Sequence, residues 1–524
     1  MKKLSILFIL FLLISCTNNE KVNVEIFTEG AKISGVNGIH FGPDGYLYAT
    51  SVIGSDISVV DTDNKTIVKR YGPKEGVFGP DDVAFNEKGE FYWTSILTGE
   101  VAGFNIQGEK VIAANLGPGV NPITFSDDGR LFVAQCFFGD GLYEVDPYGI
   151  KEPRSLKEDL GPNCGLNGMD WGPDGRLYGP RWFNNEVVSL DVDTGEMNVV
   201  VKGLNVPAAV KFNSKGILHV LDTGEGKVLK VIDGQLEVVA SLLTGLDNFD
   251  FNRKDEIFVS SYADGSILKV TDNDIVEILP GGISHPGGLT VSQNSLVVAD
   301  IQSVRAFNLS TKREDWVLRN IFRSSPLGAS TSAASLDNNI ILTSWLDNTV
   351  KILNPSNGEI IKSFEGLNIP ISTTKFDGHL AVALHGNNSI SLLKEDGSLK
   401  ILSDEFDSPT HVINYKGGLL VSDRKRGELI TVSAEGDTST LITGLDSPEG
   451  VAVVEETIFV YEGNTGEIKS ISENKISIIA KLSAGSPAAS PMQPPSMVFN
   501  GLVAYQGSVY ATDEMKRAIF KITP

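Results

Sequence analysis

NGIHFGPDGYLYATS, residues 37–51, decides the fold, because the same pattern returns as DDVAFNEKGEFYWTS from Asp81 and as NPITFSDDGRLFVAQ from Asn121. Each copy has a small polar residue, a short alternation of apolar and polar residues, a turn such as Pro-Asp-Gly, and a second alternation. Alternation rich in Val, Ile, Phe and Tyr predicts β-strands. Gly, Asp and Asn tolerate the dihedral angles of tight hairpins, so each copy predicts a β-hairpin.

The pattern recurs along the whole chain. Clear copies also begin at Asn167, Ala208 and Asp247, and weaker ones begin near Gly287, Ser332, Ser372, Thr410, Glu449 and Asn500. A period of about 40 residues suits four short strands, which is one propeller blade. Known propellers usually have about four to eight blades, so twelve copies call for division. The sequence therefore predicts an all-β fold of two tandem six-bladed β-propellers with TolB-like or NHL-like repeats.

The ends of the chain predict how the two rings close. If each half begins with its own fourth strand, the first propeller spans 22–272 and the second spans 274–524. Val22 to Phe27 would then pair with the copy at Asp247, and Ile275 to Leu279 with the copy at Asn500. The alternative is a swapped arrangement in which the last blade joins the first ring.

The first 15 residues are predicted to be a targeting signal and not a part of the folded domains. Two lysines precede an apolar run from Leu4 to Ile14, which is too short to span a bilayer and is typical of a signal peptide. The run ends in Leu-Ile-Ser-Cys, which resembles the lipobox of bacterial lipoproteins and implies lipidation at Cys16. We therefore expect a cell-envelope protein, attached to a membrane by its lipid anchor alone and lying at the outer membrane or the periplasmic face.

The net charge and the cysteine and histidine spacing indicate which classes of ligand the protein can bind. The 44 basic and 66 acidic residues give a formal net charge of −22, which argues against nucleic acid and leaves cations as natural ligands. No CxxC or clustered-histidine pattern for zinc is present. Cys136 and Cys164 are predicted to lie at the same face of adjacent blades. A disulfide between them and two free thiols both remain open.

The segment from Leu166 to Trp171, LNGMDW, and the copy around Asn121 resemble the senescence-marker-protein/gluconolactonase family, the relatives of regucalcin. The specific resemblance covers about two blades. It implies a divalent cation, often calcium, on the axis at one mouth of the propeller. In that family a Glu, two Asn and an Asp bind the cation, and the Asp is also the base in lactone hydrolysis.

The family's two Asn positions correspond to Asn121 and Asn167, whereas Asn37 stands at the Glu position and Ala208 at the Asp position. The family's catalytic carboxylate is therefore missing. The residues that open the inner strands of the first half nevertheless form an arc of side-chain oxygens, and they predict a site for Ca²⁺ or another divalent cation. The predicted ligands are Asn37, Asp81, Asn121, Asn167 and Asp247. Asp247 and Asp81 are the candidates to replace the missing base.

Aromatic and basic side chains are expected around the same mouth, where the second strands end. A ring of such side chains could stack on a sugar or another cyclic ligand, although packing between blades explains most aromatic residues in such folds. The predicted ligand-binding residues are Trp93, Arg181, Trp182 and Tyr262.

Two functions of different class follow. In the first, the N-terminal propeller binds a divalent cation and a small, sugar-derived ligand, with hydrolysis of a lactone or ester left open. In the second, both propellers are a non-catalytic scaffold for another envelope protein, and the polar arc is only a hydrated channel. The pair Asn121 and Asn167 favours the first, and Ala208 favours the second.

Overall fold

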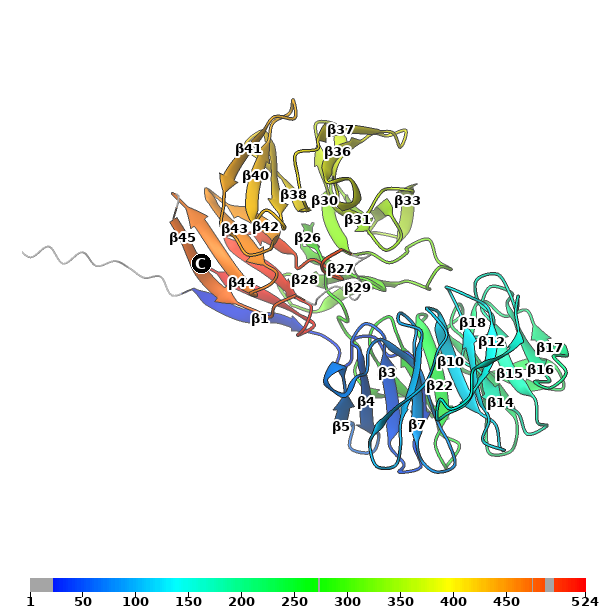
Figure 1. Ribbon diagram of the computed structural model, residues 1–524. Coiled ribbons are helices and arrows are strands. Elements are labelled where there is room, and N and C mark those ends of the chain that lie inside the picture. The colour runs from blue at the N-terminus through cyan, green and yellow to red at the C-terminus, as the bar shows by residue number, and fades with distance from the viewer. Residues whose placement is uncertain (1–21, 272–273, 474, 486–493) are drawn as a thin grey trace, which may run out of the picture.

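The structure is a computed structural model that describes residues 22–271, 274–473, 475–485 and 494–524. Its described residues form twelve four-stranded antiparallel sheets, together with the 3-10 helices η1 (Pro73–Glu75) and η2 (His385–Asn387). Figure 1 shows these sheets as two rings. No helix among the described residues is both long and apolar enough to cross a membrane. Residues 1–15 and Cys16 lie outside the described residues.

The first propeller contains 24 consecutive strands in six sheets. They are β2 (Ile39–Phe41), β3 (Leu47–Ser51), β4 (Asp56–Asp61), β5 (Thr66–Tyr71), β6 (Pro80–Phe85), β7 (Phe91–Ser95), β8 (Glu100–Phe104), β9 (Lys110–Asn115), β10 (Val120–Phe125), β11 (Leu131–Gln135), β12 (Leu142–Val145), β13 (Arg154–Lys157), β14 (Asp170–Trp171), β15 (Leu177–Arg181), β16 (Glu186–Leu190), β17 (Met197–Lys202), β18 (Pro207–Phe212), β19 (Leu218–Asp222), β20 (Lys227–Ile232), β21 (Gln235–Ser241), β22 (Leu246–Phe251), β23 (Ile257–Ser261), β24 (Ile267–Val270) and β25 (Ile275–Leu279).

The second propeller combines the first strand of the chain with all strands after β25. They are β1 (Asn23–Glu29), β26 (Leu289–Ser292), β27 (Ser295–Asp300), β28 (Ser303–Asn308), β29 (Glu314–Arg319), β30 (Ser332–Leu336), β31 (Asn339–Ser344), β32 (Thr349–Asn354), β33 (Glu359–Phe364), β34 (Pro370–Phe376), β35 (His379–Leu384), β36 (Ser389–Leu393), β37 (Leu399–Ser403), β38 (Pro409–Tyr415), β39 (Gly418–Asp423), β40 (Glu428–Val432), β41 (Thr438–Ile442), β42 (Pro448–Val454), β43 (Thr457–Glu462), β44 (Glu467–Ser472), β45 (Lys475–Lys481), β46 (Leu502–Tyr505), β47 (Ser508–Asp513) and β48 (Ala518–Thr523).

Contacts between inner strands close both rings. In the first ring β2 contacts β6 on one side and β22 on the other, and in the second ring β26 contacts β30 and β46. The hydrophobic core lies between neighbouring blades, because the alternating apolar residues of each sheet pack against the next sheet. The predicted all-β fold of two six-bladed propellers is confirmed.

The predicted closure is wrong, and so are the ranges derived from it. Strand β25 pairs with β24 and completes the last sheet of the first ring, whereas β1 pairs with β48 in the second ring. Figure 1 shows β1 in blue beside the orange and red strands of the second propeller. The predicted ranges 22–272 and 274–524 therefore each assign one strand to the wrong propeller. Strand β25 belongs to the first propeller and β1 to the second. The swapped alternative is also wrong, because β46 contacts β26 and β42 of the second ring.

The turn between β24 and β25 explains the error. The Thr271 Oγ1 donates to the Asp274 carbonyl at 2.7 Å, and the Asp274 N–H donates back to that oxygen at 3.0 Å. Only residues 271–274 separate β24 from β25 in the sequence, and the two strands pair, so no boundary between the propellers falls there. A short loop loses little entropy on closing, so residues 275–279 fold back onto the strand before them. The last sheet of the second ring then takes its fourth strand from the N-terminus.

Candidate ligand and cation site

A cavity of about 350 Å³ lies between the two propellers, at the mouth of the first ring. Polar residues that open the inner strands form its floor, and these are Asn37, Asp81, Asn121 and Asp247. The second propeller forms its roof with Ile301, Phe322, Arg323 and Met497. Much of the wall between floor and roof is apolar, for example Ile53, Ile96 and Trp182. The site is thus built by both propellers.

Two carboxylates, those of Asp81 and Asp247, line the floor, and the charge of Asp247 acts on Asp81. Asp81 is 5% exposed, and its carboxylate accepts no hydrogen bond from any described residue. Burial and the negative charges of Asp247 and Asp82 raise the pKa of Asp81 well above its usual range. Burial and Asp82 raise the pKa of Asp247 to about 7, against an opposing hydrogen bond from Asn37. Without a cation, the pair therefore holds a proton at neutral pH.

This proton makes stability depend on pH. In the unfolded chain Asp247 ionises near pH 4, whereas in the folded protein its pKa is about 7. Folding takes up a proton between these values, so the free energy of unfolding falls as pH rises from about 4 to about 7. In EDTA we expect Asp247→Asn to be more stable than the wild type at pH 8, by about 1–3 kcal/mol, and to gain nothing at pH 4. Urea unfolding at both pH values measures this, with exposed Asp437→Asn as the control. A wild-type stability independent of pH in this interval contradicts the assignment.

A second layer of charge lies further along the inner strands. The ammonium of Lys211 is buried and lies near the carboxylates of Asp82, Asp170 and Asp250. Burial lowers the pKa of Lys211, but these three charges together outweigh it, and the pKa is raised. The Asn248 Nδ2 donates to Asp82 Oδ1 at 3.3 Å across the ring. Five aspartates, including Asp81 and Asp247, thus share the ring's centre with one lysine.

The structure places some, but not all, of the other residues predicted to bind a cation on the propeller axis at the cavity. Asn121 lines the cavity, whereas Asn167 is not among the described lining residues, and its Oδ1 accepts a hydrogen bond from the Gly168 N–H at 3.0 Å. The Asn37 Oδ1 accepts from the Val52 N–H at 3.1 Å. Ala208 is fully buried among apolar side chains. The structure therefore brings four of the five predicted cation ligands to one floor and leaves Asn167 aside.

Two of the four predicted ligand-binding residues do not line the described cavity. Trp93 is 0% exposed and packs between blades against Phe91 and Phe104, because its place in β7 turns its ring toward the neighbouring sheet. Placing Trp93 at the mouth was therefore wrong. Arg181 forms an ion pair with Glu186 at 2.8 Å and is not a lining residue of the cavity.

Trp182 and Tyr262 do line the cavity, and both are held by the loop after β29. The Trp182 Nε1 donates to Ser324 Oγ at 3.0 Å, and the Tyr262 hydroxyl donates to the Asn320 carbonyl at 2.9 Å. The Phe322 N–H donates to the same hydroxyl at 3.1 Å. These bonds attach the roof of the cavity to the first propeller.

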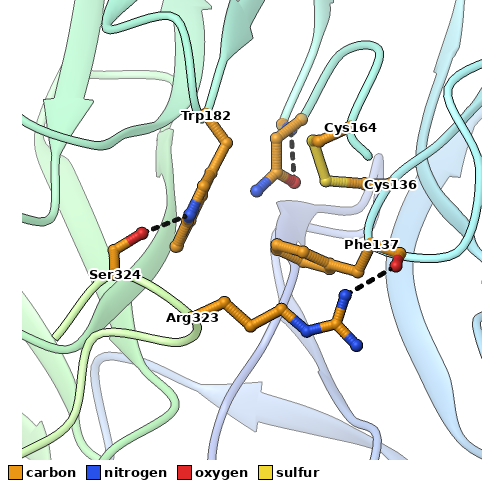
Figure 2. Close-up of a disulfide and its surroundings, with 8 residues drawn as sticks. Cys136, Phe137, Cys164, Trp182, Arg323 and Ser324 are labelled. Carbon is orange, nitrogen blue, oxygen red and sulfur yellow. Dashed lines mark hydrogen bonds between the residues drawn. A yellow bond between two sulfur atoms is a disulfide. The ribbon is translucent and has the colours of Figure 1, made fainter. Parts of the chain in front are cut away.

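The sulfur atoms of Cys136 and Cys164, the predicted pair, form a disulfide beside the cavity. Figure 2 shows it next to Phe137, whose carbonyl accepts a hydrogen bond from Arg323 Nη1 at 2.8 Å. Phe137 and Arg323 both have positive φ, at 67° and 52°. Such values are uncommon for bulky residues and tend to occur at functional sites. The disulfide fixes the chain at the point where roof and wall meet.

The described residues of the second ring form no comparable floor. The space at its centre is about 10 Å³, roughly one water molecule. Glu449 is fully buried there, accepts from Asn500 Nδ2 at 3.1 Å, and pairs with Arg424 at 3.3 Å. Its carboxylate is satisfied within the protein, unlike that of Asp81.

The donor set at the floor limits the metals that fit. Within the described part of the chain, no three His, Cys, Asp or Glu side chains converge into a metal-binding group. A cation here would have two carboxylates, an amide and water as ligands. All-oxygen sets of this kind suit Ca²⁺ and not zinc. The residues present fit a hard cation that keeps part of its hydration shell.

Two groups of residues were missed by the sequence analysis. Asp170, Lys211 and Asp250 stand at the fourth position of their repeats, so aligning the repeats by that position could have found them. The roof residues come from loops of the second propeller, including Arg323, and no repeat position marks them. Only the arrangement of the two rings brings them to the first ring's mouth.

Comparisons with known proteins place the chain in no family, since no family model and no curated protein matches it. Solved structures with a similar fold include virginiamycin B lyase from Staphylococcus aureus, at 15% identity over 53% of this chain and 96% of that chain, with a TM-score of 0.39. A streptogramin B lyase is 18% identical over 53% and 94%, with a TM-score of 0.39. The extracellular domain assigned to a one-component system of B. thetaiotaomicron is 10% identical over 96% and 83%, with a TM-score of 0.33. Likenesses at this level carry no information on function.

Proposed function

We propose that this protein binds a small ligand in the cavity between its propellers, together with a divalent cation at the cavity floor. Asp81 and Asp247 are the charged ligands of the cation, and Asn121 adds an amide oxygen. Calcium is the preferred ion because the donors are oxygens. The observation that carries the proposal is the Asp81 carboxylate, which is nine-tenths buried, lines the cavity, and has no hydrogen-bond partner among the described residues.

Electrostatics supports a cation at this place. Five buried or half-buried aspartates surround the centre of the ring, and Lys211 is the one lysine that the described residues place among them. Buried carboxylates without counter-charge are strongly disfavoured and take up either protons or cations. A divalent ion between Asp81 and Asp247 would relieve their mutual repulsion.

The walls suggest the class of the second ligand. Phe137, Trp182, Tyr262 and Phe322 are among the residues that line a space large enough for a small cyclic molecule. Aromatic faces stack on the apolar face of a sugar ring, while the cation at the floor can bind hydroxyl or carbonyl oxygens. A sugar-derived ligand, as the gluconolactonase resemblance implies, fits both features.

Hydrolysis of a lactone or ester is a secondary possibility. The family's base position is occupied by Ala208, but Asp247 has a pKa raised to about 7, which suits a general base near neutral pH. The bound cation of the proposal would lower this pKa by its charge. Asp247 is the candidate base because of its place at the cavity floor, and cation binding is the property to establish first.

Calcium titration by calorimetry on the chain from Asn19 tests the proposal. We expect saturable binding at pH 8 that is at least about tenfold weaker in Asp81→Asn, since one carboxylate ligand is lost. Binding should also weaken at pH 5, where protons compete for the pair. Asp437→Asn, on the surface, is the matched control. No heat with millimolar calcium and a folded protein would remove the cation from the account.

Lipid attachment at Cys16 in the cell envelope remains part of the proposal. The first described strand begins at Asn23 and belongs to the second propeller, so such an anchor would join the protein there. Binding of an envelope protein is the alternative function. The filled centre of the second ring suits a structural or partner-binding role for that ring.

A further inference from the structure

Arg323 is the one arginine or lysine among the described residues that line the cavity. It lies in the loop between β29 and β30 of the second propeller. Hydrogen bonds to the first propeller hold this loop on both sides of Arg323. The Phe322 N–H donates to the Tyr262 hydroxyl at 3.1 Å, and the Ser324 Oγ accepts from Trp182 Nε1 at 3.0 Å. The loop therefore places a positive charge at the cavity.

The guanidinium of Arg323 is held among residues that also line the cavity. Its Nη1 donates to the Phe137 carbonyl at 2.8 Å (Figure 2), and its Cζ lies 5.4 Å from the ring centroid of Phe138 and 5.5 Å from that of Phe322. A guanidinium within about 6 Å of an aromatic ring centroid is attracted by the ring's electrons. The planar group is thus pre-organised before any ligand binds.

The remaining nitrogens of Arg323 are available to a ligand. The side chain is exposed, and Nε and Nη2 have neither a hydrogen-bond nor an ion-pair partner in the part of the chain that the structure describes. Two other arginines of the second propeller differ, since Arg305 pairs with Asp300 at 3.2 Å and Arg319 pairs with Asp264. A guanidinium held beside a cavity without a carboxylate of its own indicates an anion that enters from outside.

Gln302 of the second propeller offers a further donor to the cavity. Its Oε1 accepts from Asn320 Nδ2 at 2.8 Å, and this bond fixes which way the amide points. Its Nε2 has no partner among the described residues and, unlike the ring nitrogens of His285 at the same cavity, is not sealed from solvent. The second propeller therefore presents N–H donors, which suit a ligand group that accepts hydrogen bonds.

Charge balance in the cavity favours a monoanion once the floor holds a divalent cation. Asp81 and Asp247 then neutralise that ion. Asp347, the other carboxylate among the described lining residues, lies near the ammonium of Lys351, on which its charge acts. The charge of Arg323 is left without a counterpart. A carboxylate supplies one negative charge and two oxygens in the geometry that the guanidinium fork binds.

We infer that Arg323 binds a carboxylate of the cavity ligand, and that this ligand is a sugar acid. The inference rests on the proposed function and adds to it the anionic class of the ligand and a specificity residue from the second propeller. The cation at the floor binds hydroxyl oxygens of the ring, while Arg323 binds the carboxylate through Nε and Nη2.

Ligand-observed NMR at pH 8 in saturating calcium tests this inference with two probes that differ at one carbon. Methyl β-D-glucuronide carries a carboxylate where methyl β-D-glucopyranoside carries a hydroxymethyl group. The glucuronide should bind the wild type, and it should bind Arg323→Gln about tenfold more weakly, because a charge-assisted hydrogen-bonded pair is lost. The glucoside should bind the wild type more weakly than the glucuronide does, and its affinity should be the same in Arg323→Gln.

Arg313→Gln is the matched control, since Arg313 is exposed on the same propeller and is not one of the described lining residues. It should bind the glucuronide as the wild type does. Equal glucuronide affinity in all three proteins contradicts the role of Arg323, and so does the absence of glucuronide binding to the wild type.

Calcium affinity, measured in the same samples, separates the remaining outcomes. An equal loss of calcium, glucoside and glucuronide affinity in Arg323→Gln would show that Arg323 only holds the loop in place, and would overturn the inference. If calcium does not bind the wild type, the cation of the proposed function fails. A glucuronide affinity that depends on Arg323 would still support the carboxylate site in that case.

Discussion

Lys211→Met is expected to destabilise the first propeller by about 3–5 kcal/mol at pH 8, because removing one partner of a buried ion cluster leaves the others without compensation. The ammonium lies near Asp82, Asp170 and Asp250, and burial already raises the pKa of Asp82 and of Asp170. At pH 5 the loss should be smaller, since protons then neutralise part of the remaining charge.

Urea unfolding at pH 8 and pH 5 measures this effect. Lys230→Met is the matched control, because Lys230 pairs with Glu237 on the surface and both side chains are well exposed. Such pairs contribute about 0–1 kcal/mol. A Lys211→Met protein as stable as the Lys230→Met protein would show that the aspartates are neutralised in another way.

Removal of β1 is expected to lower the stability of the second propeller by at least about 3–5 kcal/mol, the usual effect of losing a large buried aromatic side chain. The strand pairs with β48 from Asn23↔Thr523 to Glu29↔Ala518. Phe27 is 4% exposed, and its ring lies 5.3 Å from that of Tyr510. A chain that begins at Gly30 loses both the pairing and this packing.

Calorimetric melting of chains beginning at Gly30 and at Val22 tests the closure. The chain from Val22 is the control and should melt like the longer protein. In the chain from Gly30 the melting temperature of the second propeller should fall. The melting temperature of the first propeller should not change, because β25 closes the first ring. A lower melting temperature of the first propeller alone would contradict this closure and support the one predicted from the sequence.

The fold could be predicted because it depends on a local pattern. The apolar alternation and hairpin turns repeat twelve times, and each copy specifies its own sheet. Closure could not be predicted in the same way. Residues 23–29 and 275–279 have the same strand character, and pairing is decided by the short turn at Thr271 and by the free edge of β48.

The candidate site was predictable only in its floor. Asp81, Asn121 and Asp247 open their repeats, so their positions follow from the repeat register. Trp93 was misplaced because a residue near the end of a strand can face the neighbouring blade as well as the mouth. His285 and Arg323 belong to connections between and beyond the repeats, whose positions depend on how the two rings pack.

The most direct test of a cation between Asp81 and Asp247 is an anomalous diffraction measurement on crystals soaked with a lanthanide in place of calcium. The account predicts one strong peak at the cavity floor, within about 2.3–2.6 Å of a carboxylate oxygen of each residue. It also predicts that the peak disappears in Asp81→Asn crystals. A lanthanide bound only elsewhere, with this floor empty and the wild-type protein intact, would contradict the central claim.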